Sequence, residues 1–147
     1  GRRKCILRIK CIKIMSYYDF EGKFIGLDTV QNTIITNSKF SYEFILGLLN
    51  SKFISWFTYK FIYCSAIRTM HFDNGYIGKI IIPNISLKEQ KPIVDIVNLI
   101  LDKTRKNNFH ENMILKTEVV NLQKNVDDCV YDLFGISDDE ISIIENI

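Results

Sequence analysis

Few side chains in this sequence have the types and spacing that catalysis requires. His71 and His110 are each alone, so neither a metal pair nor a nucleophile dyad follows from their spacing. Asp127 and Asp128 are adjacent on a predicted helix and point to different faces, which suits solvated helix charges, one of them near a subunit contact, better than shared acid–base work. The phosphate-binding, dinucleotide-binding, nucleophile-elbow and zinc-protease motifs do not occur. We therefore expect no catalysis by this chain alone and no cofactor bound to it.

The four cysteines do not predict a metal site. Cys5, Cys11, Cys64 and Cys129 contain no CxxC pair and are not accompanied by clustered histidines. A chain with this much apolar sequence does not need a disulfide framework. We expect reduced thiols that pack as small apolar groups, as in a cytoplasmic protein.

One irregular segment, Lys60–Lys79, offers side chains suited to binding double-stranded DNA. It has no clear hydrophobic period, so we expect a long loop between regular elements, where binding residues are often placed. Its polar side chains can bond base edges, its lysines can contact phosphates, and its aromatic rings can pack or stack. The alternative is an ordinary surface loop. The candidate DNA-contacting residues here are Lys60, Tyr63, Arg68, Thr69, His71, Asn74 and Lys79.

Charge is distributed unevenly, although the net charge is only +2. Residues 1–110 contain 17 Lys/Arg and 8 Asp/Glu, a balance of +9, whereas residues 111–147 contain 2 and 9, a balance of −7. The first thirteen residues are basic without an acid, and we add Arg8 and Lys10 to the candidate DNA contacts. This asymmetry favours a polyanion partner for the front of the chain and another partner, or solubility, for the back. A solvated surface with a local excess of charge is the alternative.

The front of the chain has the patterns of short strands. Apolar and β-branched residues that approximately alternate with polar ones are typical of strands, and Glu21-Gly22 predicts the turn of a hairpin. Pro83 suits the end of a strand rather than its middle. The predicted strands are Cys5–Met15, a second hairpin arm from near Phe24, Thr33–Thr36 and Tyr76–Ile82.

Two helices are predicted between these strands. Phe44, Leu48 and Leu49 have helical spacing, and Ser41 can cap the first turn. Asn50 or Ser51 is a plausible break, and a second short helix follows around Trp56. The aromatic residues near this tryptophan are predicted to be chiefly core rather than a stacking platform.

The back of the chain predicts helices only. Ser86–Glu89 has the spacing of a capping box, and Pro92 requires either a kink or a regular helix that begins near Lys91. Apolar residues then step by helical intervals, and after a polar connection Leu115–Leu133 repeats them as a heptad seam. Two such helices predict an antiparallel helical hairpin. Gly135 is expected to end the second helix, and Ser137–Glu140 to cap a last short one.

The predicted fold is therefore α+β. We expect a small, twisted, mostly antiparallel sheet with inserted helices, followed by the helical hairpin and a short C-terminal helix. Residues 1–85 would form a DNA target-recognition lobe. Residues 86–147 would form the hairpin and an acidic tail, packed on that lobe or on a partner domain. No uncharged apolar stretch is long enough to span a membrane.

The order of these features resembles a known family. The strings "GLLNSKFISWFTYKF", "GYIGKIIIPNISLKEQKPIVDIVNLIL" and "VDDCVYDLFGISDDEISIIE" are similar to the TaqI-like C-terminal specificity domain of adenine-specific DNA methyltransferases and of fused Type II restriction–modification enzymes. The matching features are Leu49-Asn50-Ser51, the proposed strand that ends at Pro83, and Glu89-Gln90 before an aliphatic helix. Specificity subunits of Type I restriction systems have similar junctions. The resemblance covers roughly residues 4–147.

The resemblance implies a target-recognition module. It would read a short duplex sequence, largely in the major groove, for a methyltransferase domain that transfers a methyl group from S-adenosylmethionine to adenine. That domain has an Asn-Pro-Pro-aromatic motif, which this sequence lacks. We therefore expect either an excised fragment of a larger enzyme or a separate chain that acts in trans, and any cleavage would also lie elsewhere. The alternative, of another class, is an assembly module whose helical hairpin joins proteins, for example as a homodimer.

Overall fold

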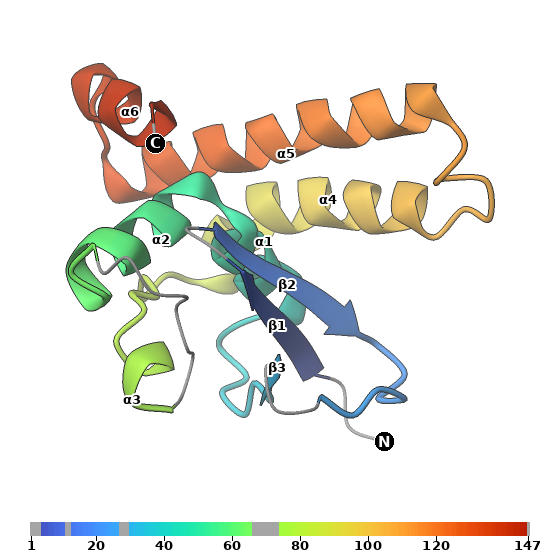
Figure 1. Cartoon of the computed structure of the whole chain (residues 1–147), viewed down its shortest axis with the longest axis horizontal. Coiled ribbons are helices and arrows are strands. Elements are labelled where there is room, and N and C mark those ends of the chain that lie inside the picture. The colour runs from blue at the N-terminus through green and yellow to red at the C-terminus, as the bar shows by residue number, and fades with distance from the viewer. Residues whose placement is uncertain (1–3, 11–12, 27–29, 66–73, 147) are drawn as a thin grey trace.

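The computed structural model of the chain describes residues 4–10, 13–26, 30–65 and 74–146. It contains both strands and helices and includes the expected helical hairpin (Figure 1). Two elements are single turns, the π-helical turn η1 and the short helix α3. In chain order the elements are β1 (Lys4–Lys10), β2 (Lys13–Asp19), β3 (Val30–Thr33), α1 (Tyr42–Asn50), α2 (Lys52–Phe57), η1 (Thr58–Ile62), α3 (Asn74–Ile77), α4 (Leu87–Thr104), α5 (Met113–Phe134) and α6 (Asp138–Glu145).

The three strands form an antiparallel sheet in the order β2-β1-β3. In its register Lys10 lies opposite Lys13, and Arg8 lies opposite both Met15 and Val30. In β2, Ile14 and Tyr18 are buried, whereas Lys13, Met15 and Tyr17 are exposed, and the alternation ends at the buried Asp19. Up to Tyr18, strand β2 therefore has one side on the core and one side toward solvent, as strands of antiparallel sheets often do.

The N-terminal hairpin differs from the prediction. The segment Cys5–Met15 is divided between β1 and β2, and the described residues after Asp19 form no strand up to Gly26. The predicted turn at Glu21-Gly22 is instead a bend held by the buried carboxylate of Asp19, which accepts the backbone N–H groups of Lys23 and Phe24 at 3.1 and 3.0 Å. Local bonding by an aspartate side chain thus replaces the second hairpin arm.

Two further strand predictions are wrong. The strand predicted at Thr33–Thr36 lies earlier, as β3, and retains only Thr33. The stretch Tyr76–Ile82 is not a strand: its beginning belongs to helix α3, and Ile81 and Ile82 have no regular structure and remain 39% and 44% exposed. A short apolar run does not determine its own secondary structure, and Asn74-Gly75 begins a helical turn here. No strand therefore leads into the helix that begins at Leu87.

The helical predictions are confirmed more closely. Ser41 caps α1, with its side chain accepting the N–H of Phe44, and Ser51 separates α1 from α2. Ser86 and Glu89 form a complete capping box, and α4 runs through Pro92 from Leu87 onward. A proline near the start of a helix removes only one backbone bond, so the helix tolerates it.

Helices α4 and α5 pack side by side as the antiparallel hairpin, and α1 packs against α4 (Figure 1). A glycine permits the second contact: a Cβ at Gly47 would lie 2.6 Å from Ile93 Cγ2 and 3.0 Å from Val97 Cγ2. The heptad seam of α5 faces inward, where Leu115 and Val126 are buried. One core cluster contains side chains from β2, α1, α2, α4, α5 and α6, so it includes residues from both predicted lobes.

The C-terminal end of the chain also matches the prediction. Gly135 ends α5 in the left-handed conformation with a φ of 66°, and Ser137 with Glu140 forms the capping box of α6. Ile144 is buried on the inner side of α6. No helix among the described residues is both long and apolar enough to cross a membrane.

Candidate nucleic-acid interface

The two ends of the segment Lys60–Lys79 lie together. The ring of Tyr63, just after η1, stacks on the ring of Tyr76 in α3, with centroids 4.6 Å apart and planes 16° from parallel. The ammonium groups of Lys60 and Lys79 lie 5.9 and 5.5 Å from the ring centroids of Tyr59 and Tyr76, respectively. We call Tyr59, Lys60, Tyr63, Tyr76 and Lys79 the tyrosine–lysine surface.

Lys60 and Lys79 are the exposed cations of this surface. Elsewhere among the described residues, four lysines pair with carboxylates: Lys23 with Glu21, Lys52 with Glu145, Lys91 with Asp95 and Lys103 with Glu118. Exposed lysines such as Lys39, Lys88 and Lys106 do not. Within the described part of the chain, Lys60 and Lys79 have no such partner. The local sequence explains this, since Asp73 is the one acidic residue between residues 44 and 88.

Helix α3 also reaches the sheet. The side-chain amide of Gln31 in β3 donates from Nε2 to Oδ1 of Asn74 at 3.4 Å. Strand β3 pairs with β1, and in that register Arg8 lies opposite Val30, the neighbour of Gln31. The tyrosine–lysine surface is thus joined to the β3 edge of the sheet, and Figure 1 shows α3 and β3 at the end of the molecule away from the helical hairpin.

The backbone near the start of the segment Lys60–Lys79 is unusual. Tyr63 donates its N–H to the carbonyl of Thr58 at 3.0 Å, which is the wide spacing of a π-helical turn. Cys64 and Ser65 follow with φ angles of 49° and 56°, in the left-handed region that residues other than glycine rarely adopt. Both π-helical turns and such backbone strain are more frequent at functional sites than elsewhere.

The predicted contact residues therefore have different outcomes. Lys60 and Asn74 are exposed but belong to η1 and α3, so the expectation that they lie in a loop was wrong. Tyr63 and Lys79 lie beside them, while Arg8 and Lys10 belong to β1. Arg68, Thr69 and His71 lie outside the described residues. Sequence reasoning missed Gln31, which has no local signal, and Tyr76, which it had assigned to a strand.

The residues that carried the family resemblance have structural roles. Asn50 binds β2 to the end of α1: its Oδ1 accepts the N–H of Ser16 at 2.9 Å, and its Nδ2 donates to the Ser16 carbonyl at 3.1 Å. The hydroxyl of Ser55 accepts the N–H of Ile14 at 3.1 Å. Because β2 is an edge strand, these two side chains satisfy backbone groups that would otherwise be unpaired.

Gln90 has a comparable role at the start of α4. Its fully buried amide accepts the N–H of Ser41 at 3.1 Å and donates to the carbonyls of Lys39 and Ile85 at 2.6 and 3.3 Å. One side chain therefore joins the beginning of α1 to the beginning of α4. The Glu89-Gln90 pair is explained by the capping box and this buried amide, without a ligand.

Asp127 is not a solvated helix charge, which corrects the prediction, whereas Asp128 is exposed. The Asp127 carboxylate accepts the N–H of Lys52 at 2.9 Å, at the first residue of α2. Burial raises the pKa of Asp127, and the bond from Lys52 partly offsets this effect. Next to it, Glu145 of α6 accepts bonds from the Lys52 ammonium and from the Tyr131 hydroxyl, and the Lys52 bond lowers the Glu145 pKa. This cluster attaches α6 to the core.

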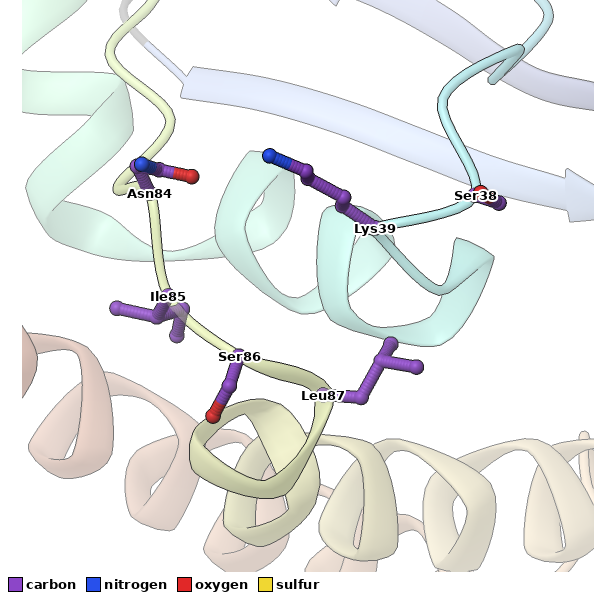
Figure 2. Close-up of a pocket in the computed structure, with 6 residues that line it drawn as sticks. All are labelled: Ser38, Lys39, Asn84, Ile85, Ser86 and Leu87. Carbon is purple, nitrogen blue, oxygen red and sulfur yellow. The ribbon is translucent and has the colours of Figure 1, made fainter.

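Two pockets of about 380 Å³ that are lined by described residues lie away from the tyrosine–lysine surface. Figure 2 shows the first, between Lys39 and residues Asn84–Leu87. It lies at the N-terminus of α4, but the Glu89 carboxylate already bonds Ser86 there, which disfavours a second anion. The other pocket is lined by aromatic residues of β2 and the following bend and by Arg105, whose guanidinium lies 5.8 Å from the Phe20 ring centroid.

No family model, curated protein or solved structure matches the chain. Among the described residues, no group of three or more histidine, cysteine or acidic side chains is arranged to hold a metal ion. Cys64 is exposed and Cys129 is half-buried, both as free thiols. The tyrosine–lysine surface and the adjoining Gln31–Asn74 pair are therefore the arrangement whose chemistry best suits a binding site.

Proposed function

We propose that the chain is a sequence-specific duplex DNA recognition module of a restriction–modification enzyme. The observation that carries this proposal is the tyrosine–lysine surface, where two exposed lysines without a described acidic partner lie over the rings of Tyr59 and Tyr76. Tyr76 stacks on Tyr63, and the exposed Asn74 begins the same helix as Tyr76. Lysines on such a surface can contact phosphates, and amide side chains can read base edges. The basic balance of residues 1–110 supports the same partner.

In this proposal the chemistry belongs to other domains. The family resemblance suggests a methyltransferase domain, in cis or in trans, that uses S-adenosylmethionine to methylate adenine, and it leaves open whether the parent enzyme also cleaves DNA. The acidic residues at the end of α5 and the start of α6 are poorly suited to lie along phosphates. The helical hairpin and α6 would instead pack on that domain.

Salt-dependent DNA binding tests the proposal. Each phosphate contact contributes about −0.9 to the slope of log K against log salt for duplex DNA, so about five contacts give a slope of about −4 to −5. The double substitution Lys60→Ala and Lys79→Ala should make the slope less steep by about 2. A matched double variant, Lys91→Ala and Lys103→Ala, removes two lysines that are already paired with carboxylates and should change the slope less. Equal slopes for the wild type and the first variant would contradict the proposal.

A second candidate function is protein assembly through the helical hairpin. It is favoured by four exposed apolar side chains of α4 and α5: Leu99, Met113, Ile114 and Val120 are 50%, 70%, 73% and 67% exposed. Leu122, by contrast, lies half-buried on the seam of α5. If assembly is the main function, Ile114→Lys should abolish association in sedimentation experiments while DNA binding remains negligible at all salt concentrations.

A further inference from the structure

The Gln31–Asn74 pair has the chemistry to recognise one particular base. Asn74 is exposed at the start of α3, and Gln31 is half-buried on the edge strand β3. The Gln31 Nε2 atom donates to Asn74 Oδ1 at 3.4 Å and lies 3.5 Å from the carbonyl oxygen of Asn32. The two hydrogens of the Gln31 amide therefore point to two acceptors, Asn74 Oδ1 and the carbonyl oxygen of Asn32.

This contact orients the Asn74 amide, with its oxygen toward Gln31. The oxygen of a side-chain amide has two lone pairs and the nitrogen has two hydrogens. The bond from Gln31 uses one lone pair of Oδ1 and leaves the other, and no described residue accepts a bond from Nδ2. Asn74 thus presents one acceptor and one donor, side by side, with their order held by Gln31.

Adenine is the base whose major-groove edge matches this order. It presents the N6 amino donor next to the N7 acceptor, and asparagine can bond both at once. Guanine presents two acceptors, which would place O6 against the Asn74 oxygen, and cytosine and thymine each lack one of the two partners. Lys79 follows α3 by two residues, and Lys60 precedes by three residues the tyrosine that stacks on α3, so both can hold phosphates while the amide enters the groove.

We infer that Asn74 reads an adenine of the target sequence through N6 and N7, and that Gln31 is the residue that positions it. The inference rests on the proposed function, because it requires duplex DNA in contact with the tyrosine–lysine surface. The Tyr63–Tyr76 stack supports it, since the stack attaches α3 to the end of η1 and so limits the movement of Asn74.

The experiment begins with selection of duplexes from a random pool by the full 147-residue chain. Each adenine of the recovered consensus is then replaced by 7-deazaadenine, which retains base pairing but lacks the N7 acceptor. At one adenine this replacement should weaken binding by about tenfold, as for a lost bidentate contact. Asn74→Asp should remove the sensitivity at that adenine and shift preference there toward cytosine, whose N4 amino group donates to a carboxylate.

Gln31 is tested by a change that reverses the amide. In Gln31→Glu the new carboxylate can only accept, so it should draw Nδ2 of Asn74 toward itself and turn Oδ1 toward N7. Discrimination between adenine and the other bases should then fall about tenfold, while the salt slope and the thermal midpoint stay as in the wild type. A role for Gln31 in folding alone would lower the midpoint and leave the base preference unchanged.

The outcomes separate the two proposals. A consensus in which no adenine depends on Asn74 overturns adenine reading and leaves duplex recognition intact. Recovery of no consensus, together with a flat salt dependence, overturns both. Loss of 7-deazaadenine sensitivity at one adenine in both variants, with the salt slope unchanged, supports both.

Discussion

The amides of Gln90 and Asn50, fully buried and half-buried respectively, and the tyrosine–lysine surface use polar groups in opposite ways. Gln90 and Asn50 bond to the backbone of other segments of the chain, at distances from 2.6 to 3.3 Å. Lys60 and Lys79 have no described acidic partner, and their ammonium groups lie over tyrosine rings. The first arrangement holds the fold together, and the second leaves charge available to a ligand.

This difference shows that a recognisable sequence pattern can reflect the fold rather than a binding site. The patterns that made the chain resemble a specificity domain, Leu49-Asn50-Ser51 and Glu89-Gln90, lie at helix junctions and bond to the chain itself. Such residues can indicate a shared fold, but they carry no information about a ligand. The segment Lys60–Lys79 has no comparable pattern, and among its described residues Lys60, Asn74 and Lys79 are exposed. Fold and function therefore depend on different residues here, and each can be disturbed separately.

The largest effect is expected for Gln90→Leu. The leucine fills a similar volume but leaves the N–H of Ser41 and the carbonyls of Lys39 and Ile85 without their partner. Each buried polar group that loses its partner costs about 1–3 kcal/mol, so the free energy of unfolding should fall by about 3 kcal/mol or more. Urea denaturation followed by circular dichroism measures it.

Gln123→Leu is the matched control for that substitution. Gln123 lies half-buried on α5 and makes a single bond, 3.4 Å long, to the carbonyl of Asn50. Its replacement should cost less than about 1 kcal/mol, the value of one ordinary hydrogen bond. Equal losses in the two variants would show that Gln90 is not the junction between α1 and α4.

A smaller but still large effect is expected for Asn50→Ala. It removes both bonds to the backbone of Ser16 and exposes the outer edge of β2. We expect a loss of about 2 kcal/mol, since the N–H of Ser16 can partly recover a bond to water. Asn98→Ala, at an exposed position of α4, provides the comparison and should change stability by about 0.5 kcal/mol or less. Faster hydrogen exchange at Ser16 in Asn50→Ala alone would locate the effect.

The helices could be predicted from the sequence because their signals are local. Ser41, Ser86, Ser137 and Gly135 act within one turn, so their spacing alone determines where helices begin and end. The heptad seam of α5 likewise predicted that this helix packs against another helix. Apolar residues at steps of three and four form one face of a helix, and that face must be buried. These parts needed no knowledge of the remaining fold.

The strands and most of the site could not be predicted in this way. The run Lys79-Ile-Ile-Ile favours a strand by composition. Whether it forms one depends on a neighbouring strand with which it can pair, and the local sequence does not predict that neighbour. The burial of Asp127 depends on the N–H of Lys52, 75 residues away in the chain. The bond between Gln31 and Asn74 spans 43 residues, so only the folded chain brings the two amides together.

A third prediction concerns acid, where the carboxyls of the buried Asp127 and the exposed Glu145 have opposite effects on stability. The Glu145 pKa is lowered from 4.5, mainly by the bond from Lys52, so its stabilising effect is present above 4.5 and is lost as pH falls through the lowered value. The Asp127 pKa is raised from 3.8 by burial, so its charged form costs stability above 3.8, and this cost disappears as pH falls through the raised value.

Substitution can separate the two carboxyls. Glu145→Gln should lose less stability on acidification than the wild type, with a difference below about 1 kcal/mol because the ion pair is partly exposed. Asp127→Asn keeps an acceptor for the Lys52 N–H. It should lose more stability on acidification than the wild type, because in the wild type protonation of Asp127 removes the cost of a buried charge, and the asparagine has no such charge to neutralise. Urea unfolding at a series of pH values measures both. Parallel pH profiles for all three proteins would contradict the assigned causes.

The smallest effect on stability is expected at the tyrosine–lysine surface itself. Lys60→Ala and Lys79→Ala each remove an exposed cation whose contact with a tyrosine ring contributes about 0.5–1 kcal/mol at most, and solvation of the free side chain in the unfolded state offsets part of that. The free energy of unfolding should therefore change by about 0.5 kcal/mol or less in either variant. Lys52→Ala, which removes a lysine bonded to Glu145, should cost more. If Lys60→Ala or Lys79→Ala instead destabilised the chain as much as Asn50→Ala, these lysines would belong with Gln90 and Asn50 as part of the fold, and their availability to DNA would have no support.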